Sequence, residues 1–375
     1  MYIFEKVEQE PTAMTMTGAT HTIELDENSD YSMLLLRFNW TADSSQIDAS
    51  KERILDWITS ITVIGDDDKY IVNASARELA ALHFYRRRYP VFEVVDNKDN
   101  STNILELPIY FGRYFGDTEY FLRGGIFNKL ELNVTNGDSA TGNYFDAGTL
   151  EVRSYQFKDH ALSPTAVLRP KQIKSWTPPS ATASHTETLP DKWRIEKILI
   201  EAQPTYQDRT TDLTAEYWEL LDKIKLTFKG GDVVVFNDDT EELAWRNALV
   251  YGLARTSGYF TGQENDFVDS GLGYRRGAHA TLAQDASAAG LEPEILKNTT
   301  QKLKWLQQGT AADTDYYWEA WGQAYLDTVI FDWAPDGNMA NLYDPAVYKK
   351  GQLKLTAGST AGKINIMVVE EVTSF

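Results

Sequence analysis

The sequence predicts an all-β protein made of two tandem jelly-roll β-sandwiches, a double jelly roll. Each sandwich is expected to carry a short helix, and the second a long loop insertion. Many short segments alternate apolar and polar residues at period two, separated by turn residues, which is typical of sandwiches and barrels. The same order of elements recurs in both halves of the chain, which indicates a tandem duplication. With 375 residues, 42% hydrophobic and 24% charged, the chain has the composition of a globular protein.

The first copy of the repeated unit begins with residues 60–85, SITVIGDDDKYIVNASARELAALHFY. This stretch predicts a strand, a turn at residues 65–68, a return strand and a helix. The helix begins with Ser75 and Glu78, which have the spacing of a capping box, where each side chain bonds the backbone of the other residue. Alternating or apolar segments predict further strands at residues 107–110, 130–134 and 150–157.

The second copy begins with residues 223–250, KIKLTFKGGDVVVFNDDTEELAWRNALV. It repeats the strand, a glycine turn, the return strand and a helix that begins with Asp239 and Glu242. Leu79 and Leu243 occupy the same place in the two helices, 164 residues apart (79 to 243). Further strands are predicted at residues 328–331, 353–355 and 363–369, in the order seen in the first half.

Composition divides the chain between the two units. We expect an N-terminal arm and first jelly roll over residues 1–170, a linker over 171–190, and a second jelly roll over 191–375. The linker is predicted because this region is rich in Pro, Ser and Thr and has no apolar period. A long insertion at about 252–320 distinguishes the second unit, and such loops are usually functional or fold on their own. Within it, residues 291–309 have helix-like spacing.

Charge and composition exclude several classes of function. The net charge of −19 argues against binding nucleic acid through its phosphates, which needs clustered Lys and Arg. The one basic run, 86–88, ends a predicted helix, where cations are favoured, so we expect it on the surface. There is no cysteine, no run of eighteen apolar residues and no secretory signal pattern at the N-terminus. We therefore expect folding in a reducing cytoplasm.

No catalytic motif stands out, so no enzymatic activity and no cofactor are expected. The five histidines have no metal-ligand spacing, and the sequence contains neither a nucleophile elbow nor a P-loop. The acidic run Asp66, Asp67 and Asp68 could hold Ca²⁺ through carboxylate oxygens. It also stands at the tip of a predicted hairpin, where Asp is favoured by turn geometry, and we prefer that interpretation.

Two aromatic clusters are candidates for binding surfaces. Tyr317, Trp321 and Tyr325 could stack on sugars, but their i, i+4 spacing equally makes one buried face, and we favour a core or subunit contact. Residues 105–122, LELPIYFGRYFGDTEYFL, combine aromatic residues with glycines and charges. Arginine and aromatic residues are enriched at the centres of protein interfaces, so we predict that Arg113, Tyr114 and Phe115 contact a neighbouring domain or subunit.

The segment LELPIYFGRYFGDTEYFL, followed by KLELNVTNG, resembles the double jelly-roll major capsid proteins of tailless icosahedral viruses, in particular their bacterial and archaeal members. In the second half DKIKLTFKGGDVVVF, DDTEELAWRNAL and FVDSGLGYRRG resemble the second jelly roll of the same proteins. The resemblance covers roughly residues 50–135 and 195–370. Its motifs are moderately specific, and none is a catalytic signature.

The resemblance implies a structural capsid protein of the virion, present in the host cytoplasm before assembly. It implies homotrimers of pseudo-hexagonal outline that tile an icosahedral shell and contact neighbouring capsomers. Minor capsid, vertex or spike proteins and an internal membrane are further implied partners, and no sequence-specific contact with nucleic acid is expected. The family's long loops face outward, which suggests an outward loop containing Gly271, Gly273, Arg275 and Arg276.

Two other readings remain open from the sequence. A carbohydrate-binding or carbohydrate-cleaving β-sandwich could use the aromatic-rich insertion, and carbohydrate-active proteins also pair sandwiches. A viral tail or spike protein would also be trimeric and rich in β-structure, but it would not need two matched jelly rolls. Saturable glycan binding by a monomer would favour the first of these alternatives.

Overall fold

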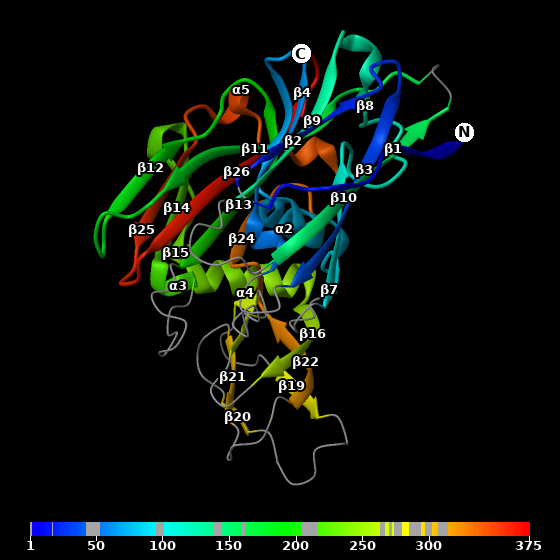
Figure 1. Cartoon of the computed structure of the whole chain (residues 1–375). Coiled ribbons are helices and arrows are strands. Elements are labelled where there is room, and N and C mark those ends of the chain that lie inside the picture. Colours follow the sequence, from blue (N-terminus) through cyan, green and yellow to red (C-terminus); the bar gives the residue numbers. More distant parts are fainter. Residues whose placement is uncertain are drawn as a thin grey trace.

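The computed structural model describes two β-sandwiches side by side, with a helix between them (Figure 1). The described residues are 2–16, 18–42, 53–94, 101–137, 145–158, 162–204, 217–262, 267–269, 272–273, 280–284, 294–296, 302–306 and 314–375. The α-helices are α1 (Ile54–Trp57), α2 (Ala76–Arg87), α3 (Tyr217–Leu220), α4 (Thr240–Tyr251) and α5 (Pro345–Tyr348).

The first sandwich consists of two facing sheets. One sheet has the order β1-β10-β3-β7-β6, with β8 pairing with β3, and the other has the order β2-β9-β4-β5. The strands are β1 (Ile3–Ala13), β2 (Thr20–Leu25), β3 (Asp30–Ala42), β4 (Ile58–Gly65), β5 (Lys69–Ala74), β6 (Phe92–Val94), β7 (Thr102–Tyr110), β8 (Leu122–Arg123), β9 (Leu130–Asn136) and β10 (Phe145–Phe157).

The second sandwich repeats this plan. Its sheets have the orders β11-β26-β13-β24 and β12-β25-β14-β15, which match β1-β10-β3-β7 and β2-β9-β4-β5 strand for strand. The predicted double jelly roll is therefore confirmed, as is the duplication on which it rested. The strands are β11 (Val167–Trp176), β12 (Ser184–Thr188), β13 (Arg194–Pro204), β14 (Leu221–Phe228), β15 (Val233–Asp239), β24 (Thr328–Asp332), β25 (Gln352–Ala357) and β26 (Gly362–Val372).

The two sandwiches share one sheet and part of one core. Strand β5 of the first pairs in parallel with β11 of the second at Asn73 and Lys171, so an eight-stranded sheet crosses the joint. On β13, Leu199 is 1% exposed and belongs to the apolar core of the first sandwich, whereas Ile198 and Ile200 belong to that of the second. Full burial of such a side chain stabilises the fold by about 1.5–3 kcal/mol, so the joint is held by apolar packing.

The segment expected to be a linker, residues 171–190, forms strands instead. Strand β11 pairs with β26 from Val167↔Val372 to Trp176↔Ile364, and β12 pairs with β25. The region lacks a clean apolar period because β12 is an edge strand and β11 meets β5 only at Lys171. Pro170 is tolerated in such a position, since few of the hydrogen bonds on that side are formed.

The long insertion lies between α4 and β24. Its strands β16 (Ala254–Gly262) and β22 (Thr314–Gly322) pair from Ala254↔Gly322 to Gly262↔Thr314, which joins its two ends in one ribbon. The helix-like spacing at 291–309 was misleading for the described residues 294–296 and 302–306, which form strands, and Tyr317, Trp321 and Tyr325 also lie in strands. The remaining strands are β17 (Phe267–Asp269), β18 (Leu272–Gly273), β19 (Ala280–Gln284), β20 (Glu294–Leu296), β21 (Lys302–Leu306) and β23 (Ala324–Tyr325).

Candidate interaction surfaces

Helix α2 is the central element of the joint between the sandwiches. Its N-terminus has the predicted capping box: Glu78 N–H donates to Ser75 Oγ at 3.2 Å, and Ser75 N–H donates to Glu78 Oε2 at 2.8 Å. All residues from Ala76 to Tyr85 are buried, which an amphipathic surface helix would not show. The helix packs on β7 and β4 of its own sandwich and on β13 of the other (Figure 1).

Arg77 links α2 to the second sandwich through buried carboxylates. Its Nε donates to Glu201 Oε1 at 2.6 Å and its Nη2 to Asp327 Oδ2 at 3.2 Å, while Nη1 binds Asp56 of α1. The Arg77 side chain is 6% exposed, and those of Glu201 and Asp327 are at most 2% exposed. Charges this deeply buried are tolerated only when they are paired and hydrogen-bonded, so Arg77 fixes the position of β13 against α2.

A second buried cluster lies at the other end of α2. Arg86 Nη2 donates to Glu196 Oε2 at 2.8 Å, and Lys197 Nζ lies 2.8 Å from Glu196 Oε1 and 2.7 Å from Asp332 Oδ2. The predicted surface position of the basic run is thus wrong for Arg86, which is 3% exposed at its side chain. The helix ends at this basic run as expected, but the guanidinium of Arg86 binds Glu196 of the second sandwich.

The joint also shifts the pKa values of its carboxyl groups. Burial, reinforced by the nearby charge of Glu201, raises the pKa of Glu78 to about 8. Burial alone would also raise the pKa of Glu196, but Arg86 and Lys197 outweigh it and lower that pKa to about 2. Glu196 is therefore ionised and paired at neutral pH, whereas Glu78 holds its proton.

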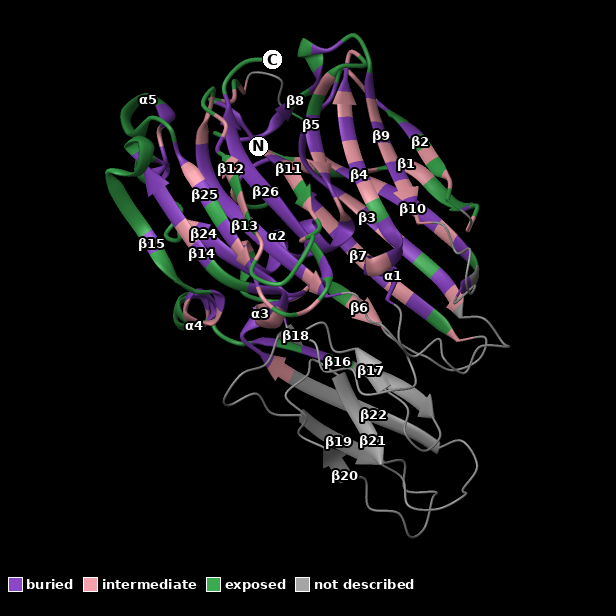
Figure 2. Cartoon of the chain, turned by 90° about the vertical axis from the view of Figure 1, so that its left-hand side faces the viewer, coloured by how far each residue is buried: buried purple, intermediate pink, exposed green. Residues whose placement is uncertain are grey.

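Helix α4 holds the same place in the second sandwich, but one face of it is exposed (Figure 2). Leu249 is 71% exposed, and Trp245 and Val250 are each close to half exposed. The preceding strand β15 is an edge strand whose three consecutive valines are also exposed. A cluster of exposed apolar side chains on adjacent elements is typical of an interaction surface. We call it the α4 face; its members are Val233, Val234, Val235, Trp245, Leu249, Val250 and Leu253.

The predicted interface residues Arg113, Tyr114 and Phe115 lie in the loop after β7. Arg113 Nε donates to Asp117 Oδ2 at 2.7 Å, and Arg113 Nη2 donates to Glu119 Oε2 at 2.7 Å, so Arg113 organises the loop itself. Tyr114 and Phe115 are 46% and 43% exposed. The ring of Phe115 lies edge-on to Tyr155 of β10, with 5.4 Å between their centroids. Two of the three are thus available for contact, and their role stays a prediction.

The acidic run at residues 66–68 forms the tip of the hairpin between β4 and β5. Asp66 and Asp67 have positive φ angles of 49° and 66°, as in the tight turns that join antiparallel strands. Asp66 accepts from the Asn128 amide at 2.7 Å and from Lys69 Nζ at 2.8 Å. Over the residues that the structure describes, no three His, Asp or Glu side chains are grouped so that they could hold a metal ion. This geometry agrees with the preferred interpretation of the run as a turn.

The predicted outward loop is only partly described. Gly273 lies in the short strand β18 and pairs with Ala324 of β23. Gly271, Arg275 and Arg276 lie outside the described residues. The outward loop therefore stays a prediction.

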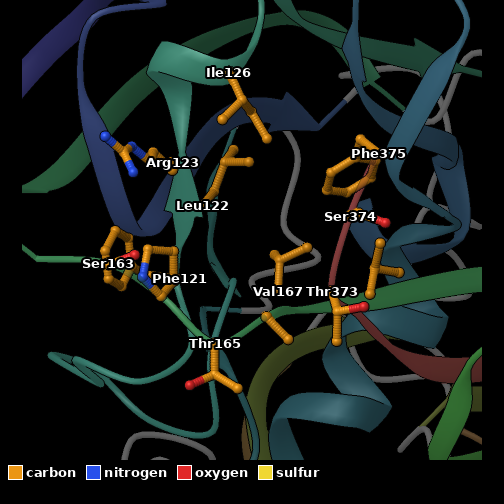
Figure 3. A pocket seen from close by; sticks show the side chains of 13 residues that line it. Phe121, Leu122, Arg123, Ile126, Ser163, Thr165, Val167, Thr373, Ser374 and Phe375 are labelled. Carbon is orange, nitrogen blue, oxygen red and sulfur yellow. The ribbon is translucent and has the colours of Figure 1, made fainter.

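A hollow of about 160 Å³ lies between β8, the start of β11 and the C-terminal residues (Figure 3). Its lining has one charged side chain, Arg123, and includes no Asp, Glu or His. Its Ser and Thr hydroxyls have no Asp, Glu, His or Lys side chain beside them in the lining that could activate them as nucleophiles. Among the described helices, none is long and apolar enough to cross a membrane.

The buried ions of the joint were not predicted from the sequence. Arg77, Glu196 and Glu201 stand in a helix and a strand that carry further charged residues, so nothing in the sequence marks these three as buried. The partners lie more than a hundred residues apart, so the sequence alone could not pair them.

Comparison with known proteins finds solved structures of similar fold but no family model or curated sequence that matches this sequence. The solved structures similar to it include the major capsid protein of Sulfolobus turreted icosahedral virus, with 10% identity, a TM-score of 0.59 and coverage of 100% of this chain and 98% of that one. The major capsid protein P2 of bacteriophage PM2 has 9% identity, a TM-score of 0.52 and coverage of 100% and 98%.

A capsid protein of the virus PBCV-1 is similar over 98% of this chain and 93% of its own, with 9% identity and a TM-score of 0.55. At such identities the likeness establishes the fold alone. The chain therefore has, from end to end, the double jelly-roll fold of these major capsid proteins.

Proposed function

We propose that this chain is a major capsid protein, whose copies assemble into a virus shell. The single observation that carries the proposal is the end-to-end match of a duplicated sandwich to double jelly-roll capsid proteins from viruses of several kinds. The described residues agree with a structural role: the joint is built from packing and buried ion pairs, and the lining of the hollow near the C-terminus holds no Asp, Glu, His or Lys. A non-enzymatic role is part of the proposal.

The proposed assembly unit is a homotrimer of pseudo-hexagonal outline that tiles an icosahedral shell. Two matched sandwiches in each chain give three chains six similar faces, which suits a hexagonal lattice. Contacts between such units would be spread over large areas, in keeping with the absence of a concentrated site in the described part of the chain.

The proposed partners are copies of this chain in the same and in neighbouring capsomers, together with minor capsid, vertex or spike proteins and an internal membrane. We propose the virion as its location, after synthesis in the host cytoplasm. The net charge of −19 keeps unassembled subunits soluble and disfavours direct binding to the genome.

The proposal is tested by the native mass of the purified chain, measured by light scattering, with negative-stain images of the same sample. A species of three chains with a hexagonal outline is the expected result. A monomer at every concentration, even under conditions that promote assembly, would contradict the proposal. If such a monomer bound glycans saturably, the carbohydrate-binding alternative would replace it.

A further inference from the structure

A buried lysine faces a buried aspartate across two strands of the joint. Lys197 of β13 and Asp332 of β24 are directly paired in the antiparallel register. The Lys197 Nζ lies 2.7 Å from Asp332 Oδ2, and the two side chains are only 3% and 5% exposed. Removing two charges from water is costly, and replacing them by uncharged groups is often neutral or stabilising. An amine and a carboxyl group in contact can lose both charges by condensing to an amide.

A β-bulge brings Glu196 to the same lysine. The register of β13 against β26 shifts between Ile195 and Lys197. Ile195 and Ile198 both belong to the core of the second sandwich, so the two residues between them share the opposite side, which faces α2. There Glu196 Oε1 lies 2.8 Å from Lys197 Nζ, and Glu196 Oε2 accepts from Arg86 at 2.8 Å. Bulges that re-aim a side chain in this way are over-represented beside active sites.

The two carboxyl oxygens of Asp332 have different donors. Oδ1 accepts from the backbone N–H of Ala334 at 2.8 Å. Oδ2 accepts from the hydroxyl of Tyr251 and faces Lys197 Nζ. The Tyr251 side chain is almost fully buried, and its ring packs edge-on against the ring of Tyr85. An N–H group aimed at a carbonyl oxygen stabilises the negative charge that develops there when the carbonyl carbon is attacked. Oδ1 is therefore placed to remain after such an attack, and Oδ2 to leave.

From this geometry we propose that Lys197 and Asp332 form an isopeptide bond, by which the chain links its own strands β13 and β24 covalently. The reaction needs no external reactant, because one ammonium and one carboxylate yield one amide and one water molecule. The inference does not depend on the proposed capsid function, and it assigns a chemical role to ions that otherwise only hold the joint together.

Every atom is accounted for in the reaction. A proton first passes from Lys197 Nζ to Asp332 Oδ2 along their contact, which leaves an uncharged amine and an uncharged acid in a site where burial disfavours ions. The Nζ lone pair then attacks Cγ and forms the C–N bond, while negative charge gathers on Oδ1 beside the Ala334 N–H. The carboxylate of Glu196 relays one proton from the nitrogen to the Oδ2 hydroxyl. The Cγ–Oδ2 bond breaks, and water leaves.

The product leaves no charge of this cluster without a partner. Amide formation removes the ammonium and the carboxylate together, and Glu196 keeps its ion pair with Arg86. The new amide oxygen, Asp332 Oδ1, keeps its hydrogen bond from the Ala334 N–H. Strand pairing holds the two reacting groups in contact, so the step needs no encounter in solution.

The bond would tie together the strands on either side of the long insertion. Strand β13 precedes α4 and the insertion, and β24 follows them. The segment between Lys197 and Asp332 therefore becomes a closed covalent loop. Such a link lowers the conformational entropy of the unfolded chain, so the second sandwich would resist unfolding when the insertion is pulled or loosened.

The intact mass of the purified chain, measured by mass spectrometry in denaturing solvent, tests the proposal. We expect a mass lower than that of the sequence by one water molecule. Tryptic digestion should then give a branched peptide that joins the segments containing Lys197 and Asp332. A chain that keeps its full sequence mass, both freshly purified and after prolonged incubation in the folded state, overturns the proposal. This measurement needs no variant, so it does not depend on how a substitution affects folding.

Matched variants identify the source of the lost water. Lys197→Arg keeps a cation but removes the nucleophile, and it should keep the full mass. The control is Lys69→Arg, because Lys69 Nζ also lies 2.8 Å from a carboxylate, that of Asp66, outside the joint. That variant should still lose one water molecule. A succinimide at Asp336, which precedes a glycine, would also remove water but would persist in Lys197→Arg. Loss of water from Lys197→Arg therefore overturns the proposal.

A time course tests the part assigned to Glu196. Glu196→Gln retains the shape of the side chain but cannot relay the proton. After cell-free synthesis, the linked fraction of this variant should grow several-fold more slowly than that of the unsubstituted chain. Equal rates would overturn the role of Glu196 as proton relay.

Discussion

Arg77 shows how single side chains define the geometry of this molecule. It binds three carboxylates from two sandwiches, and its contacts with Glu201 and Asp327 are almost completely removed from water. Replacing both members of such a pair by apolar residues can be neutral, whereas removing one leaves an uncompensated buried charge. Arg77 therefore contributes more to the placement of the two sandwiches relative to each other than to the packing of either core.

Arg77→Met is predicted to destabilise the chain by about 3–5 kcal/mol, because the carboxylates of Glu201 and Asp327 lose their cation while they remain buried. Urea unfolding measures the loss. The matched control is Arg246→Met, which removes an exposed ion pair with Glu242 on α4 and should cost about 1 kcal/mol at most. Equal effects of the two substitutions would contradict this account of the joint.

Glu78 makes stability depend on pH near neutrality. Burial and the charge of Glu201 raise its pKa from 4.5 to about 8, so the unfolded chain releases this proton at lower pH than the folded chain. Its contribution to stability is complete below pH 4.5 and is lost as the pH rises towards 8. Glu78→Gln, which retains an acceptor for the cap, should reduce this loss. Parallel stability–pH curves of the two proteins would show that Glu78 is not the source.

Phe115 tests the interface predicted around the loop after β7. Its ring is 43% exposed and rests on Tyr155 of strand β10. Phe115→Asp is predicted to weaken trimer assembly while the melting temperature of the isolated chain stays within a few degrees. A variant trimer of normal mass and normal dissociation would refute the role given to Phe115.

Helices α2 and α4 are corresponding elements of the two sandwiches, but their surroundings give them different contacts. Their lengths and positions are equal, but α2 has a formed capping box, whereas the side chain of Asp239 makes no capping hydrogen bond to α4. The sequence suggested a cap at both. Local spacing determines where a helix can begin, and the structure determines which side chains complete the bond.

This difference predicts unequal effects of removing the two cap residues. Ser75→Ala should destabilise the chain by about 1 kcal/mol, because a hydrogen bond to the buried N-terminus of α2 is lost. Asp239→Ala should change the free energy of unfolding by only about a few tenths of a kcal/mol, because Asp239 makes no capping hydrogen bond. Thermal unfolding of both variants measures the contrast, and an equal loss would mean that the cap of α2 is not a stabilising contact.

Ten of the eighteen strands described in the two sandwiches, and both long helices, could be predicted because their signals are local. Period-two alternation at residues 130–134 and the Ser75–Glu78 spacing each specify an element within a few residues. Strands β11 and β12 gave no such signal, since edge strands and a proline weaken the alternation. They become strands only because β26 and β25 offer them backbone partners.

The candidate surfaces were less predictable than the fold. An exposed aromatic such as Phe115 is visible in the sequence, but the exposure of Leu249 depends on what the rest of the chain leaves uncovered. The pairing of Arg77 with Glu201 joins residues 124 positions apart and follows from packing alone. Duplication was the decisive sequence signal, because it allows one surface to be inferred from its counterpart.

The complete chain is a pair of similar sandwiches with one joint closed and its counterpart open. The closed joint buries α2, shares a sheet through β5 and β11, and carries two ion clusters. The α4 face, on the corresponding helix of the second sandwich, is exposed. This arrangement leaves an apolar helix face exposed, which assembly would cover.

A cryo-EM map of the assembled species tests this arrangement most directly. The expected result is a threefold ring of six sandwiches with a hexagonal outline, in which a neighbouring chain covers the α4 face of each chain. A twofold dimer, or a ring in which the α4 face remains open to solvent, would contradict the account.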